Sequence, residues 1–359
     1  MMQPNPAGEL NIVLQLQGNT ISELEIRSGR PRSAGKLFEG RQISEVVTLL
    51  PQLFSLCGIS QQIAAISAAE QALGYNPGVD LLRNRRQLLL AEQGREQLLR
   101  LWRDWLGMAP EMQQVFNRYN RWFTSTQQLL APALELAPPA YEPLEPKTMP
   151  KLLPVASAET RLKRLKKEQS KDLIDDALLK LQQELGEVQL NSRAPELMEL
   201  PPLKLMEVIS PAFCEQPQWK GICMQTDALN PNVISRDRSV HPMVAWLLGL
   251  VSTLQQLSSE LQNARWTLPR ERLPVGTGIA QVASARGLLI HKVVLEGDTV
   301  AEYQMVAPTE WNFHPQGTLR QMLRGVTVDN HRQAETLANR LTLLIDPCVG
   351  FSVEVTDSA

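Results

Sequence analysis

The sequence lacks several features that define common protein classes. It has only four cysteines in 359 residues, too few for a disulfide framework. No apolar run approaches the roughly 18 to 20 residues of a membrane-spanning helix, and no charged start leads into an apolar stretch. The net charge of −2 provides no basic field for nucleic acid or anionic membrane. We expect a cytoplasmic protein with free or metal-binding thiols and no nucleic acid or membrane partner.

The sequence does contain what a folded core requires, since 43 % of residues are hydrophobic and 21 % are charged. Alternating apolar residues predict two β-hairpins, and apolar residues spaced three and four apart predict long helices. The expected fold class is α+β, mainly helical, with peripheral β-hairpins. The hairpins are expected at 10–16 with 21–27 and at 287–295 with 300–306, and the helices at 60–73, 79–107, 109–130, 242–261 and 332–344.

A proline-rich and charged segment divides the chain. Prolines recur between Ala131 and Pro154, where they exclude a helix or a central strand. A charged helix is expected over 161–186, as a solvated face or mobile arm, or as a docking site for an acidic partner. We therefore predict two parts of one domain, 1–130 and 205–359, separated by a linker and helical insertion over 131–204.

Two short cysteine motifs stand at opposite ends of the chain. Leu56-Cys57-Gly58-Ile59-Ser60 and Asp346-Pro347-Cys348-Val349-Gly350-Phe351 each look like a C-x-x-C metal clip that has lost its second cysteine. Cys57 directly precedes an expected helix, whose dipole favours a thiolate. Cys214 and Cys223 have no metal-clip spacing, and we interpret them as buried apolar residues.

The two cysteine motifs belong to a series of five that resembles the large subunit of nickel-iron hydrogenases. That family carries G-H-x-R-I-E, R-x-C-G-x-C-x-x-x-H, E-A-P-R-G-x-L-x-H, V-P-[ST]-x-W-N and D-P-C-x-x-C-x-x-H in this order. The resemblance implies the large-subunit-like fold in a truncated form. The corresponding stretches here are Gly8–Val13, Ser55–Ala64, Ala283–His291, Ala307–Asn312 and Asp346–Glu354.

The departures from the family pattern indicate lost catalysis. In the family the second cysteine of each pair bridges nickel and iron, but here Ser60 and Phe351 stand at these positions. Phenylalanine offers no donor atom, and serine is a poor ligand for a soft metal site. The family's acidic residue in the first motif is replaced by Val13. The resemblance thus implies a protein that is not an enzyme and holds no nickel.

Other matching positions favour a site for iron. In the family an arginine and a V-P-[ST] segment bind the cyanide ligands of an iron that also carries carbon monoxide. Arg286, Pro308 and Thr309 occupy these positions, while Cys57 and Cys348 keep the first cysteine of each pair. This pattern resembles the inactive, large-subunit-like hydrogenase assembly proteins of the HupK/HoxV type. Leu53–Gly58 and Gln225–Leu229 resemble the same branch.

The resemblance implies a maturation scaffold that transiently holds the iron-cyanide-carbonyl fragment through Cys57 and Cys348. Its expected partners are the hydrogenase large subunit and other hydrogenase maturation proteins. One alternative is a metal-free docking module or chaperone, and another is a residual nickel-dependent hydrogenase. Simpler roles are an ion pair for Arg286 and a structural hydrogen bond for His291. If iron is held, Cys57, Cys348 and Arg286 must line one pocket, with 131–200 outside it.

Overall fold

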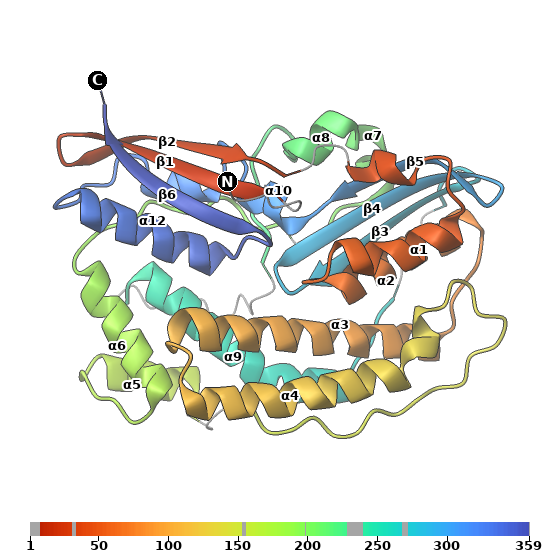
Figure 1. Ribbon diagram of the computed structural model, residues 1–359, viewed down its shortest axis with the longest axis horizontal. Coiled ribbons are helices and arrows are strands. Elements are labelled where there is room, and N and C mark those ends of the chain that lie inside the picture. Colours follow the sequence, from red (N-terminus) through yellow and green to blue (C-terminus); the bar gives the residue numbers. More distant parts are fainter. Residues whose placement is uncertain are drawn as a thin grey trace, which may run out of the picture.

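Two three-stranded sheets lie on one side of the molecule, above a layer of long helices, in the computed structural model (Figure 1). The structure describes residues 8–30, 34–152, 156–197, 199–227, 240–267 and 272–358. Ala228 and Leu229 of the 225–229 motif fall outside these ranges. None of the helices within them is long and apolar enough to cross a lipid bilayer.

The first sheet joins the two ends of the chain. Strands β1 (Glu9–Gln17) and β2 (Thr20–Ser28) form the expected antiparallel hairpin, with β1 side chains alternately exposed and buried. Strand β6 (Gly350–Asp357), which the sequence analysis does not predict, pairs in parallel with β1 and places Phe351 opposite Leu10. This pairing fixes the segment after Cys348 beside the N-terminal hairpin.

The second sheet supports the helix that follows Cys57. Strands β3 (Thr277–Ser284), β4 (Gly287–Glu296) and β5 (Thr299–Val306) form an antiparallel sheet in that order, and helix α2 (Gly58–Ala72) packs against β3 and β4. The approach is close because a Cβ atom added at Gly278 would lie 1.8 Å from the Ala68 carbonyl oxygen. The predicted β4–β5 hairpin is confirmed, while β3 is additional.

The predicted long helices are also confirmed. They are α3 (Val79–Arg100), which continues as a π-helical turn η2 (Leu101–Trp105), α4 (Pro110–Leu129), α9 (Pro242–Gln262) and α12 (His331–Ile345). Leu98, Leu250 and Leu341, from three of these helices, belong to one buried cluster. The N-terminal and C-terminal parts therefore share a core.

The charged segment differs from the expectation of one solvated helix. It forms two helices, α5 (Ala158–Leu165) and α6 (Leu173–Leu185), that pack against α9. Arg161 is buried, with Nη1 2.7 Å from Asp172 Oδ1 and 2.6 Å from Asp175 Oδ1. The buried apolar residues of this segment join the main core, and they are Leu165, Ile174, Leu178, Leu181 and Leu185. The expectation of a free arm is therefore wrong, because one face of the segment is buried, but the expected solvated face is present, with Lys163 and Glu159 exposed. The domain boundaries at 130 and 204 stay a prediction.

The remaining short elements connect these parts. Helix α1 leads toward Cys57, α8 and α10 lie beside β5 and β4, and α11 precedes α12. Their bounds are η1 Ala34–Phe38, α1 Ile43–Leu53, η3 Ala131–Leu134, α7 Pro202–Val208, α8 Pro211–Glu215, α10 Pro308–Asn312 and α11 Thr318–Leu323.

Candidate functional site

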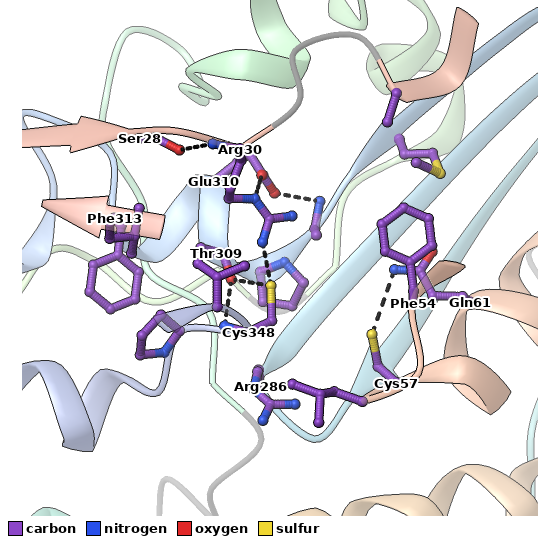
Figure 2. Close-up of a pocket in the computed structure, with 18 of the residues that line it drawn as sticks. Ser28, Arg30, Phe54, Cys57, Gln61, Arg286, Thr309, Glu310, Phe313 and Cys348 are labelled. Carbon is purple, nitrogen blue, oxygen red and sulfur yellow. Dashed lines mark hydrogen bonds and ion pairs between the residues drawn. The ribbon is translucent and has the colours of Figure 1, made fainter. Parts of the chain in front are cut away.

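A pocket of about 1500 Å³ contains all five residues that the sequence analysis selects for the site. The end of β2, the segment between α1 and α2, the end of α3, helix α8 and the turn after α12 contribute to its walls. The five residues are Cys57, Cys348, Arg286, Pro308 and Thr309, and Figure 2 shows both cysteine side chains in the pocket. Among the described residues of 131–200, none lines it.

Cys57 stands at the N-cap position of α2, as the sequence predicts. Burial raises the pKa of its thiol to about 12, and negative charge on Glu92 and Cys348 adds to the shift. Arg286 and the Gln61 amide, whose Nε2 lies 3.7 Å from the sulfur, oppose it only in part. Loss of hydration therefore works against the ionised form that the helix dipole favours.

A buried hydrogen-bond chain holds the Gln61 amide in place. His291 Nε2 lies 2.8 Å from Gln61 Oε1, and His291 Nδ1 lies 2.8 Å from the Tyr303 hydroxyl. Burial lowers the pKa of His291 to about 3, so the imidazole is neutral and has one donor and one acceptor nitrogen. With Nε2 protonated, the amide oxygen of Gln61 accepts and its N–H faces Cys57. The structural role considered for His291 is thus confirmed.

Cys348 has a different environment, with two donors on its sulfur. Thr309 Oγ1 lies 3.0 Å from Sγ and also accepts the Cys348 backbone N–H at 3.2 Å. Arg30 Nη1 donates to the same sulfur, and Arg30 Nε lies 2.8 Å from Glu310 Oε1 (Figure 2). Sequence analysis missed Arg30, because it belongs to none of the five motifs and is 318 positions from Cys348.

Arg286 is held by two carboxylates at the base of the pocket. Its Nε lies 3.2 Å from Asp346 Oδ2, and its Nη2 lies 3.5 Å from Glu96 Oε2. Burial opposes the guanidinium charge, but Asp346 and Glu96 raise the pKa of Arg286 above its ordinary value. The ion pair considered as a simpler role is therefore present. Nη1, in contrast, is buried and has no hydrogen-bond partner in the part of the chain that the structure describes.

The positions of the two absent cysteines offer no metal ligand set. The Ser60 hydroxyl donates to Glu92, which also accepts the backbone N–H groups of Ile59 and Ser60 at 2.8 and 2.9 Å. Phe351 lines the pocket with an aromatic ring. Within the described ranges, no group of three or more histidine, cysteine, aspartate and glutamate side chains could hold a metal ion.

The other two cysteines are less alike than the sequence analysis expects. Cys223 is buried, with its sulfur 3.2 Å from His314 Nδ1. Cys214, on α8, is half-buried and lines the same pocket as Cys57. Burial raises the pKa of Cys214 to about 12, so it is a neutral thiol at physiological pH.

Comparison with known proteins identifies the family of the chain. The chain is 30 % identical over 363 residues to the hydrogenase expression/formation protein HupV of Azotobacter chroococcum mcd 1, covering 97 % of this chain and 99 % of that protein. HupK of Azotobacter vinelandii is 30 % identical over 364 residues, with the same coverage. The chain belongs to this family of hydrogenase expression/formation proteins. A family model described as nickel-dependent hydrogenase matches residues 232–354.

Solved structures of nickel-iron-selenium hydrogenases share the fold of this expression/formation protein. The reduced enzyme of D. vulgaris Hildenborough superposes with a TM-score of 0.55 at 14 % identity, covering 93 % of this chain and 94 % of that one. The enzyme of Desulfomicrobium baculatum gives 0.58 at 12 % identity, covering 93 % and 95 %. These likenesses confirm the predicted large-subunit-like fold. Membership in the family of hydrogenase expression/formation proteins supports a role of this chain in hydrogenase maturation.

Proposed function

We propose that this protein is a non-enzymatic scaffold in hydrogenase maturation that transiently holds an iron fragment carrying cyanide and carbon monoxide. Cys57 and Cys348 bind the iron, and Arg286 and Thr309, with Pro308 beside it, receive the diatomic ligands. The partners are the hydrogenase large subunit and other maturation proteins, and the exchange takes place in the cytoplasm. The fragment is a cargo that enters and leaves the pocket.

The observation that best supports this proposal is the free donor of Arg286 beside two thiols. Its Nη1 is buried without a hydrogen-bond partner among the described residues, in a side chain that is only 9 % exposed. An unsatisfied buried donor costs free energy unless a ligand supplies the acceptor. A cyanide nitrogen is such an acceptor, and a hydrogen bond to a charged donor contributes about 1.5 to 3 kcal/mol.

The thiols suit the same cargo. Soft thiolates bind low-spin iron that carries π-acceptor ligands, and the fragment brings its own diatomic ligands. Two protein ligands therefore suffice, where a resident metal ion would require three or four. Ser60 is bound to Glu92 and Phe351 has no donor atom, so a nickel site with four thiolates cannot form. This argues against a residual nickel-dependent hydrogenase.

Infrared spectroscopy together with metal analysis tests the proposal. Protein purified without oxygen from cells that contain the other maturation proteins is expected to contain iron, no nickel, and infrared bands of cyanide and carbon monoxide. The Cys57→Ala and Cys348→Ala variants are expected to lose most of this iron. Cys223→Ala is the matched control, because Cys223 does not line the pocket. Bands at full occupancy in both pocket variants would exclude the iron scaffold.

A metal-free docking module is the second candidate, and the rim of the pocket favours it. Leu37, Leu53 and Leu56 line the pocket and are 63 %, 55 % and 40 % exposed. Exposed apolar residues that cluster at a cavity are typical of protein-binding surfaces. Full restoration of hydrogenase assembly by a Cys57→Ser and Cys348→Ser double variant is the result expected of a docking module. Loss of assembly with unchanged partner binding is the result expected of the scaffold.

A further inference from the structure

The two sulfurs of the pocket have unequal hydrogen bonding. Cys348 Sγ accepts from Thr309 Oγ1 at 3.0 Å and from the charged Arg30 Nη1. For Cys57 Sγ, the described residues supply one contact, the neutral Gln61 amide at 3.7 Å. Figure 2 shows the two environments on opposite sides of the pocket. The asymmetry does not depend on the protonation state of either cysteine.

Hydrogen bonds to a thiolate change its strength as a metal ligand. A donor that points at the sulfur withdraws electron density from the lone pairs that bind a metal, which is why such bonds tune metal–thiolate centres. A charged donor has about twice the effect of a neutral one. Cys348 is therefore the weaker ligand of the pair, and Cys57 is the stronger one.

Arg30 is anchored so that it keeps facing the sulfur. Its Nε lies 2.8 Å from Glu310 Oε1, and Glu310 Oε2 accepts the Ala307 backbone N–H at 3.0 Å. The side chain of Arg30 is only 15 % exposed, which limits its freedom to swing into solvent. The guanidinium is therefore held where it competes with a metal for one side of Cys348.

We propose that Cys348 is the first ligand to leave the iron during handover, and that Arg30 is the positioning residue that makes this bond labile. The inference rests on the proposed function. In this step the Cys348 sulfur–iron bond breaks, the electron pair stays on sulfur, and the iron keeps its oxidation state. The released sulfur keeps its hydrogen bonds from Arg30 and Thr309. A donor atom of the accepting protein fills the vacant position on the iron.

The rate of cargo release tests this inference. Loaded protein is mixed with excess glutathione as the accepting thiol, and the decay of the protein-bound cyanide and carbon monoxide bands is followed. Arg30→Leu is expected to slow release about tenfold, the size of one lost charged hydrogen bond. The carbon monoxide band is expected at lower frequency, because a more strongly donating sulfur increases electron density on iron. Arg30→Lys keeps the charge without the planar guanidinium group, and its release rate is expected to lie between those of the natural protein and Arg30→Leu.

Matched variants separate this role from general effects. Arg83→Leu removes an arginine that also pairs with a glutamate, Glu145 at 2.8 Å, but does not line the pocket, and its release rate is expected to equal that of the natural protein. Gln61→Leu is expected to change the rate less than twofold, because the amide donor to Cys57 is neutral. These two results together with slow release in Arg30→Leu support the inference.

Other outcomes overturn it, each in a recognisable way. If Arg30→Leu protein is folded by circular dichroism but contains little iron, Arg30 is an anchor for the cargo instead of a competitor. If Arg30→Leu and Arg30→Lys both release at the natural rate, Cys348 is not made labile by Arg30. If the natural protein carries no cyanide or carbon monoxide bands, the proposed function itself fails, and the inference fails with it.

Discussion

Ser60 donates both its backbone N–H and its hydroxyl hydrogen to the carboxylate of Glu92. Ser60 stands at the position that resembles a bridging cysteine of the hydrogenase family, and here its hydrogen bonds connect α2 to α3. Burial raises the pKa of Glu92 to about 7, although the hydrogen bonds from Ser60 and Ile59 lower it. A carboxyl group that titrates near neutral pH inside the core gives stability a pH dependence.

The first prediction concerns this pH dependence. Because the folded-state pKa of Glu92 is raised above its usual 4.5, its contribution to stability is complete below pH 4.5 and is lost as the pH rises through 7. Between pH 5 and pH 8 the free energy of unfolding is expected to fall by about 2.5 kcal/mol more than in a Glu92→Gln variant. Urea unfolding at both pH values measures this difference. Parallel pH profiles for the two proteins would contradict it.

The second prediction concerns the reactivity of Cys57. A thiol with a pKa of about 12 is ionised in about one molecule in ten thousand at pH 8, compared with about a quarter for an ordinary cysteine. Alkylation of Cys57 by iodoacetamide is therefore expected to be more than about a hundredfold slower in the folded protein than in urea. Peptide mass spectrometry measures both rates. Glu92→Gln is expected to increase the folded-state rate, since the Glu92 carboxylate raises the pKa of Cys57.

The third prediction concerns Thr309, whose hydroxyl both accepts from and donates to Cys348. Thr309→Val removes both interactions without changing the side-chain volume much, and is expected to lower the free energy of unfolding of metal-free protein by about 1 to 2 kcal/mol. Thr309→Ser keeps the hydroxyl and is expected to stay within about 0.5 kcal/mol. Thr124→Val, at an exposed helical threonine, is the control. An equal loss in the valine and serine variants would contradict the assignment.

Local patterns in the sequence predict most of the fold. Strand β4 and helices α3 and α9 are buried over most of their length, and apolar runs beside a turn or at helical spacing mark them in the sequence. The alternation in β1, β2 and β5 and the helical spacing in α4 and α12 are visible because these elements bury one face and leave the other more exposed. Strand β3 lacks this contrast. Seven of its eight residues are buried or intermediate, and small residues such as Gly278 and Ala280 match the approach of α2. The residues of strand β6 do alternate in exposure, but most of them lie within the second cysteine motif, and the sequence analysis interprets this segment as a metal site and not as a strand.

The candidate site could be predicted only where a motif marks it. Cys57, Cys348, Arg286, Pro308 and Thr309 all line one pocket, because the shared core brings the ends of the chain together. Arg30 and Glu96 could not be found, since their contacts with Cys348 and Arg286 span 318 and 190 positions and depend on how the two sheets meet. The raised pKa of Cys57 follows from burial, which no local pattern reveals.

The last prediction concerns Gly278, which links the fold to the site. The space against α2 is already filled, since a Cβ atom there would lie 1.8 Å from the Ala68 carbonyl oxygen and 3.0 Å from the Ala72 backbone nitrogen. Gly278→Ala therefore forces α2 away from β3, and the free energy of unfolding is expected to fall by about 3 kcal/mol or more.

The same displacement moves the N-cap residue Cys57, so iron loading is expected to fall in the Gly278→Ala variant even at temperatures where the protein remains folded. Gly29→Ala is the control, because an added Cβ atom there meets its nearest neighbour at an ordinary 3.4 Å. Urea unfolding and iron analysis on the same preparations separate the two effects. Natural iron content in a folded but destabilised Gly278→Ala protein would show that the position of α2 does not control the site.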